Sequence, residues 1–185
     1  MLNDFEAVGY GITVLKPAQL VALNPDAVNK RSPTHKGPIV CMGPGTGLGV
    51  AQVVWDDSLK RYRVLPSEGA HGTFAPRGAL QRELQAWVEV REGYCETEQV
   101  ACGKGLLRIY EFLSEREGQE AVCSKPSEVT GAAAEGDAIA QQALQLFLII
   151  LGQEAGNKAL MTLATGGVFL AGGITPKVCH LAVYQ

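Results

Sequence analysis

Apolar and polar residues follow two different periods along the chain, and the change of period divides it into two halves. In the first half, short apolar runs at 38–42, 50–55 and 62–65 are separated by turn residues. This pattern predicts three short strands that form a small antiparallel set. In the second half, longer segments with helical spacing predict helices, at 79–89, 97–102, 106–115, 127–134 and 138–163.

Patterns near the two ends of the chain predict three further elements. Phe5, Val8 and Ile12 lie on one face of a predicted first helix, with Asn3 or Asp4 as its N-cap. An apolar run bracketed by glycine pairs at 166–173 predicts a buried strand, and Pro176 is placed to open a last helix. Strands, then helices, then a strand predict an α/β fold with a mixed sheet.

Two further stretches have simple interpretations. Residues 24–37 are rich in turn-forming and basic residues, which predicts a surface loop. The most apolar run, 143–151, is much shorter than the roughly 20 residues needed to cross a bilayer. We therefore expect it to be the buried middle of a helix.

Composition and charge narrow the class of protein. Apolar residues make up 46% and charged residues 19% of the 185 residues, which is typical of a folded globular protein and not of a disordered one. The formal net charge of −3 argues against nucleic-acid binding, which needs a basic surface. Acidic residues near Met1 argue against a signal peptide. The expectation is a cytoplasmic protein without membrane or nucleic-acid partners.

The five cysteines have no CxxC pair among them; they are Cys41, Cys95, Cys102, Cys123 and Cys179. Tight ligand spacing, as in a structural zinc site, is absent. We expect reduced, mostly buried thiols and no metal site.

Glycines are frequent, at 22 of 185 residues or about 12%, against a usual share of about 7%. One cluster is a predicted glycine loop over Gly43–Gly49, with Thr46 at its centre. Glycines let a backbone approach an anion, and a threonine hydroxyl can donate to a phosphate oxygen. The spacing fits neither a Walker loop nor a dinucleotide fingerprint. A plain hairpin turn is the alternative interpretation.

A second cluster, Gly166–Gly167 and Gly172–Gly173, flanks the predicted last strand. The two glycines after the strand leave a flat backbone surface against which a planar ring such as adenine can lie. Tight strand-to-helix packing is the alternative interpretation, which the motif alone favours.

Two polar pairs could carry chemistry. Glu68 and His71 stand three residues apart on a glycine turn, and a carboxylate and an imidazole are good partners for sugar hydroxyls. A loop histidine without a ligand is the alternative. Asn3 and Asp4 open the first helix, where a carboxylate is stabilised by the helix N-terminus. Plain helix capping explains that pair as well.

In their order and spacing, these motifs resemble the bacterial-type glucokinase family. The similarity is carried by five strings, LNDFEAV at 2–8, GPGTGLGV at 43–50, LPSEGAH at 65–71, EQVACG at 98–103 and GGVFLAGGITP at 166–176. The resemblance implies the large lobe of the actin-like ATPase (ribonuclease H-like) fold. It further implies ATP-dependent phosphorylation of D-glucose at the 6-hydroxyl, with Mg²⁺ accompanying ATP.

The resemblance also implies roles for individual residues. Asp4 matches the family's catalytic base, and Asn3, Asp4, Glu68, His71 and Glu98 match its sugar ligands. The second phosphate loop falls on Gly45, Thr46 and Gly47, and the adenosine motif falls on Gly172 and Gly173. Kinases of another hexose and a non-catalytic sugar- or nucleotide-binding fragment remain alternatives.

The same resemblance implies that the chain is partial. The family's small lobe, with its Asp-Gly-Gly-Thr phosphate loop, precedes the position of Asp4, and the family's closing segment follows the position of Gln185. We therefore expect a single incomplete domain over 1–185, with 1–13 as a hinge-side catalytic segment and 14–185 as a truncated large lobe. By itself this chain is expected to be inactive, and the expectation allows for a homodimer of the full-length parent.

Overall fold

The computed structural model describes residues 4–26 and 35–182, and these form two compact units. Unit 1 comprises Met1–Pro44, Gly49–Glu68 and Ala155–Gln185, and unit 2 comprises Gly45–Leu48 and Gly69–Glu154. Each unit is described below by itself. The assignment of 1–185 to one incomplete domain stays a prediction.

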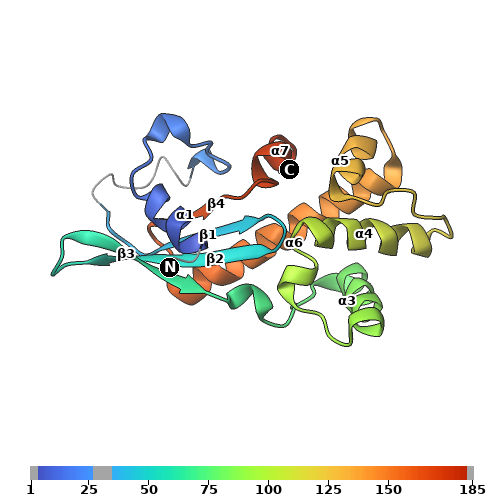
Figure 1. Cartoon of the computed structure of the whole chain (residues 1–185), viewed down its shortest axis with the longest axis horizontal. Helices are drawn as coiled ribbons and strands as arrows, with labels where there is room; N and C mark the ends of the chain where they lie inside the picture. Colours follow the sequence, from blue (N-terminus) through green and yellow to red (C-terminus); the bar gives the residue numbers. More distant parts are fainter. Residues whose placement is uncertain (1–3, 27–34, 183–185) are drawn as a thin grey trace. The chain divides into compact units, whose positions relative to one another are not determined.

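Unit 1 is built on a four-stranded mixed sheet with the strand order β3-β2-β1-β4 (Figure 1). The strands are β1 (Ile39–Pro44), β2 (Leu48–Asp56), β3 (Arg61–Ser67) and β4 (Gly167–Leu170). β2 and β3 are antiparallel, with Val53 opposite Val64, whereas β1 and β4 are parallel, with Ile39 opposite Gly167. The predicted mixed sheet is therefore confirmed, and β4 joins it beside the first strand.

Helix α1 (Asp4–Ile12) packs on one face of this sheet against β1 and β3. The ring of Phe5 lies against Gly43 of β1 and Gly49 of β2, where an added Cβ would overlap it. One turn later, Gly9 lies close to Val64. A Cβ added at Gly9 would stand 2.6 Å from Cγ1 of the valine. Of the predicted apolar face, Phe5 contacts the sheet, and Val8 and Ile12 are half-buried. Glycines on both surfaces allow the close approach.

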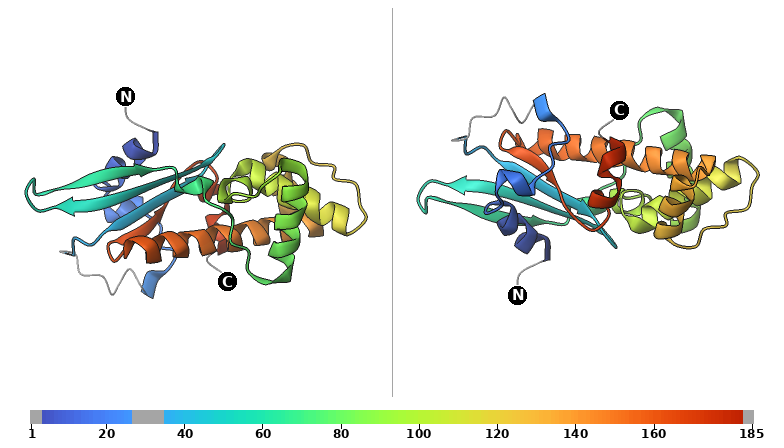
Figure 2. Two further views of the ribbon diagram at one scale, coloured as in Figure 1. Left: turned by 90° about the horizontal axis from the view of Figure 1, so that it is seen from below. Right: turned by 90° about the horizontal axis from the view of Figure 1, so that it is seen from above.

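The other face of the sheet is also covered. Val40 and Met42, whose side chains point away from Cys41 along the strand, are fully buried. Figure 2 (right) shows the last turns of helix α6 (Ala138–Thr162), which belong to unit 1, on the side of the sheet opposite to α1. This part of the fold is therefore a sheet between two helical layers.

The predicted glycine loop over Gly43–Gly49 is too long. Gly43 and Pro44 are the last residues of β1, and Leu48 and Gly49 are the first of β2, so the loop is only 45–47. Gly43 and Gly49 are glycines because the Phe5 ring packs against both strand ends, where a Cβ would overlap it. They are therefore explained by packing on the strands and not by a turn.

Unit 2 is mainly helical. It contains α3 (Gly78–Glu92), α4 (Gly103–Arg116), α5 (Pro126–Ala134) and the first part of α6. Its fully buried side chains are mainly aliphatic; they include Leu84, Val88, Leu106, Ile109, Leu113, Val129 and Phe147. Four of the five predicted helices are confirmed, with ends that differ by up to three residues.

The predicted helix over 97–102 is wrong. Only a single 3-10 turn, η3 (Thr97–Gln99), forms there, and the chain then bends into α4 at Gly103. Gly105 explains the bend, because an added Cβ there would stand 2.5 Å from the backbone carbon of Val100. The chain folds back on itself too tightly for one continuous helix.

Helix α6 confirms the interpretation of the apolar run at 143–151. Ala143, Leu144, Phe147, Ile150 and Leu151 are all buried. Asp137 caps the start of the helix by accepting a hydrogen bond from the amide of Ala140 at 2.6 Å. Among residues 4–26 and 35–182, the structure has no helix both long enough and apolar enough to cross a membrane.

The last predicted helix is present as α7 (Thr175–Ala182), one residue earlier than Pro176. Most of the predicted surface loop at 24–37 lies outside the described residues. The short 3-10 helix η1 (Pro17–Gln19) has no counterpart in the sequence prediction.

The described cysteines are free thiols, as predicted. Cys41, Cys95 and Cys102 are buried, Cys123 is half-buried, and the side chain of Cys179 is outside the described part. Burial raises the pKa of both Cys41 and Cys95 to about 12. These two side chains therefore stay protonated at neutral pH and are poor nucleophiles.

Two helical glycines should respond oppositely to alanine. We expect Gly105→Ala to destabilise the protein by about 1–3 kcal/mol, because the new methyl group meets the Val100 backbone. Gly152→Ala, in α6 with open space at the same position, should stabilise it by about 0.5–1 kcal/mol. Urea unfolding followed by circular dichroism measures both values. Equal effects of the two substitutions would contradict the close approach at Gly105.

Candidate functional site

Two separate segments of unit 2 pair and bring polar side chains together. The amide of Phe74 donates to the carbonyl of Cys95 at 2.9 Å, and the amide of Thr97 donates to the carbonyl of Gly72 at 2.9 Å. Thr73 and Glu96 form an isolated antiparallel bridge between these bonds. This backbone pairing places the short helix η2 (Gly69–His71) beside η3.

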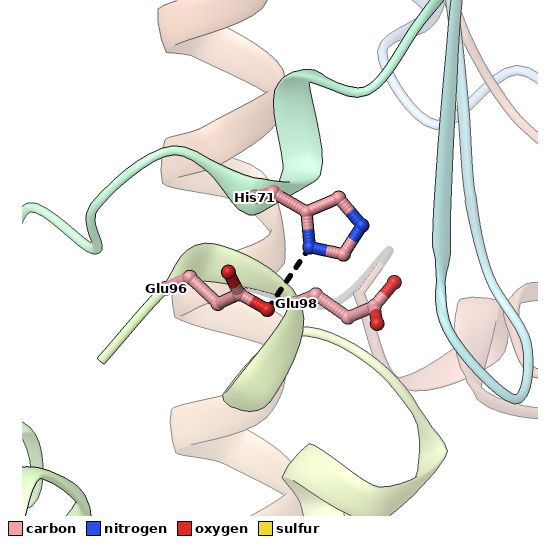
Figure 3. Close-up of side chains that lie close together, drawn as sticks. All are labelled: His71, Glu96 and Glu98. Atoms are coloured by element: carbon pink, nitrogen blue, oxygen red, sulfur yellow. Dashed lines mark hydrogen bonds and ion pairs between the residues drawn. The ribbon is translucent and has the colours of Figure 1, made fainter. Parts of the chain in front are cut away.

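The side chains that meet there are His71, Glu96 and Glu98, called here the HEE cluster (Figure 3). Nδ1 of His71 lies 3.0 Å from Oε1 of Glu96. One ligand atom from each of the three residues lies within 4.8 Å of the others. The predicted sugar ligands His71 and Glu98 are therefore brought together, although 27 positions separate them in the sequence.

Glu96 was missed by the sequence prediction. Its side chain is only 16% exposed, against 50% for His71, so the carboxylate approaches the imidazole from the protein side. Its backbone is held as well, since its amide donates to Oε1 of Gln99 at 2.9 Å. Only the spacing Glu96-x-Glu98 hinted at it, and that spacing says nothing about an imidazole 25 residues away.

Glu98 has a second partner besides the cluster. Its Oε2 accepts a hydrogen bond from the backbone amide of Leu48 at 2.8 Å. The same carboxylate lies over Gly47, where an added Cβ would overlap it. Glu98 is thus in direct contact with the loop predicted to bind phosphate.

Two hydrogen bonds of Gly45 hold the first residue of the loop. The amide of Gly45 donates to the carbonyl of Gly47 at 2.8 Å, and the carbonyl of Gly45 accepts from the amide of Gly103 at 2.9 Å. Thr46 is exposed at the tip. A loop fixed in this way can present a hydroxyl to an anion without first becoming ordered.

The HEE cluster also has the composition of a cation site. An imidazole nitrogen and two carboxylates are common ligands of divalent metal ions. Within the described residues, the ligand atoms of these three side chains lie close enough together to hold one ion. The same three acceptor-rich side chains suit a ligand with several hydroxyl groups. The geometry alone permits either.

The other predicted site residues belong to unit 1 and are described there. Asp4 is exposed at the beginning of α1, and its Oδ1 accepts a hydrogen bond from the amide of Phe5 at 2.8 Å. Glu68 is exposed and follows β3 directly. Asn3, the remaining predicted sugar ligand, lies outside the described residues.

The two glycines that follow β4 differ in their surroundings. Gly172 has a φ of +82°, and an added Cβ would stand 2.6 Å from the carbonyl oxygen of Pro44. Around Gly173, by contrast, there is nothing within 4 Å of an added Cβ. Gly172 is therefore required by the turn, whereas Gly173 leaves its backbone open to a ligand.

Comparison with known proteins gives a consistent result. The family model described as Glucokinase matches residues 1–183. A glucokinase of Mesorhizobium japonicum is 37% identical over 179 residues, which are 96% of this chain and 50% of that protein. A crystal structure of a glucokinase from an Antarctic psychrotroph superposes with a TM-score of 0.86 at 28% identity, covering 100% of this chain and 55% of that one.

A more distant structure supports the fold alone. The glucokinase of Balamuthia mandrillaris, solved in complex with glucose, has a TM-score of 0.74 at 19% identity and covers 99% of this chain. The predicted actin-like fold class is therefore confirmed. The chain spans about half the length of the curated relatives it matches.

The contact between Glu96 and His71 makes a prediction about the imidazole. An ionised carboxylate can only accept, so Nδ1 of neutral His71 should carry the proton and Nε2 should be an acceptor. Glu96→Ala should let the proton move to Nε2. Two-bond proton–nitrogen correlation spectra at about pH 8, where a free imidazole is neutral, distinguish the two forms.

The chain has three histidines, so the His71 signals need assignment. Spectra of His71→Gln identify them by their disappearance. A proton on Nε2 in the unsubstituted chain, or no change in Glu96→Ala, would show that Glu96 does not orient the ring.

Proposed function

Because the chain belongs to the glucokinase family, we propose that its parent protein transfers the γ-phosphate of ATP to the 6-hydroxyl of D-glucose. The observation that carries this proposal is the meeting of His71 and Glu98 in unit 2, with Glu98 bonded to the Gly45–Leu48 loop. A group suited to sugar hydroxyls and a loop suited to phosphate are joined there by one side chain.

Sugar recognition is assigned to Asn3, Asp4, Glu68, His71 and Glu98. In unit 2, the carboxylate of Glu98 and the imidazole of His71 offer acceptors to hydroxyl protons. A site built from such groups discriminates strongly against analogues that lack a hydroxyl, because its own polar groups are then left without partners.

Asp4 is proposed as the general base. Its carboxylate would take the proton of the 6-hydroxyl as that oxygen attacks the γ-phosphorus, and the bond to ADP breaks. Within the described residues, Oδ1 of Asp4 accepts a hydrogen bond from the Phe5 amide. A carboxylate has two oxygens and about four acceptor sites, so this bond leaves capacity for a substrate proton.

We assign ATP binding to two stretches of backbone. Gly45, Thr46 and Gly47 would meet the phosphates, and the open backbone at Gly173, after the turn at Gly172, would lie against the adenosine. Mg²⁺, held largely by phosphate oxygens and water, would neutralise charge that develops on the phosphates.

The remaining proposals concern the chain's setting. We place the parent protein in the cytoplasm and allow for a homodimer. The 185-residue chain alone should bind sugar or nucleotide weakly without turnover, since it spans about half of its relatives. Another hexose as substrate is the alternative, and mannose, fructose and N-acetylglucosamine tested beside glucose decide it.

The base is tested in a chimaera in which this chain replaces the matching 179 residues of the Mesorhizobium japonicum relative. We expect glucose 6-phosphate formation, measured by a coupled dehydrogenase assay, and a fall in kcat of about 10²–10⁴-fold in Asp4→Asn. Glu6→Gln, the same change on the next acidic residue of α1, is the matched control and should retain the rate.

Two results would contradict the proposal. A chimaera that folds and binds ATP but phosphorylates no hexose would remove the assigned reaction. Equal rates for Asp4→Asn and the unsubstituted chimaera would remove Asp4 as the base.

A further inference from the structure

The carboxylate of Glu98 takes part in two features that the family assignment treats separately. It belongs to the HEE cluster, assigned to the sugar, and its Oε2 accepts the amide proton of Leu48 at 2.8 Å, at the end of the loop assigned to phosphate. Both contacts lie inside unit 2, so they belong to one compact body.

One carboxylate can serve both contacts at once. It has two oxygens and about four acceptor sites, and the Leu48 amide occupies one of them. In Figure 3 the Glu98 side chain extends along the same side of η3 as the His71 ring, and its carboxylate stands on the side of the ring away from Glu96. A sugar hydroxyl that donates to Glu98 would therefore bind the same carboxylate that accepts from the Leu48 amide of the Gly45–Leu48 loop.

The surroundings of Gly47 show how closely the Glu98 carboxylate packs on the Gly45–Leu48 loop. An added Cβ at this position would overlap the Glu98 carboxylate, whereas at Gly45, two residues earlier, the nearest atom would stand 3.9 Å away. The atoms that a side chain at Gly47 displaces are the far end of a flexible side chain, so the backbone can stay in place while the carboxylate moves.

We propose that Glu98 couples sugar binding to the conformation of the Gly45–Leu48 loop, and that Gly47 lacks a side chain so that this carboxylate can reach both. The inference rests on the proposed sugar site. A hydroxyl that donates to Glu98 holds the carboxylate in place, and the held carboxylate keeps the Leu48 amide and the loop in the bound geometry. Because such coupling is reciprocal, a well-ordered loop also favours sugar binding.

The hydrogen bond from the Leu48 amide to Glu98 is tested first, in the 185-residue chain without ligand. Hydrogen exchange of the Leu48 amide, resolved by NMR, should be roughly tenfold faster or more in both variants, because Gly47→Ala displaces the acceptor carboxylate and Glu98→Ala removes it. Gly45→Ala adds the same methyl group to the same loop, and Glu96→Ala removes the neighbouring carboxylate of the cluster. Neither should change the Leu48 exchange rate.

The coupling is tested next by titrating D-glucose. Gly47→Ala should weaken glucose binding by roughly tenfold to a hundredfold, the loss of one hydrogen bond to a charged group, although the substituted residue lies in the phosphate loop. Gly152→Ala, a glycine-to-alanine change in α6 outside the assigned site, should keep the glucose affinity of the unsubstituted chain. Saturating glucose should slow the Leu48 exchange about fivefold or more in the unsubstituted chain, and have no such effect in Glu98→Ala.

The outcomes separate this inference from the proposed function. Glucose binding with an unaltered Leu48 amide, or equal glucose affinities of Gly47→Ala and the unsubstituted chain, would overturn the coupling and leave the sugar site standing. Where the chain alone binds too weakly to measure, the same titrations are made with the chimaera, and a chimaera that folds but binds no glucose would overturn both. Circular dichroism of each variant confirms that a loss does not come from unfolding.

Discussion

The hydrogen bond from the Leu48 amide to Glu98 is the interaction on which the site of unit 2 depends. It joins a loop between two strands to a 3-10 turn 50 positions later, and the bond from the Gly103 amide to Gly45 adds a second attachment. Together they hold the Gly45–Leu48 loop against η3 and the start of α4. A carboxylate in that position is available to a ligand only because its anchoring bond uses a fraction of its acceptor capacity.

Close approach accounts for several of the glycines in this chain. Gly43 and Gly49 make room for the Phe5 ring on the sheet, Gly47 makes room for the Glu98 carboxylate, and Gly105 makes room for the Val100 backbone. None of these four needs a left-handed backbone, unlike Gly172, whose φ is +82°. The glycines at both ends of the 43–49 cluster therefore serve packing, and Gly47 in the loop between them makes room for a carboxylate.

The parts of the fold that the sequence predicted are those governed by local periodicity. The strands β1, β2 and β3 and the helices α3 to α6 follow from local patterns, either a short continuous apolar run or a periodic spacing of apolar residues. The failures lie where a distant contact overrides the local pattern. The segment 97–102 has helical spacing, yet Thr97 bonds to Gly72 and Gly105 packs on Val100, so only one turn forms.

The sequence by itself determined the order of elements, the family and the identity of most candidate ligands, because these depend on residue types and their spacing along the chain. Only the tertiary structure decided which side chains meet. It paired Gly72–Phe74 with Cys95–Thr97 and so brought Glu96 to His71, and it placed Glu98 on Leu48. Contacts between residues 25 or 50 positions apart leave no periodic signal, because they arise from backbone hydrogen bonds and close packing that no local window of sequence contains.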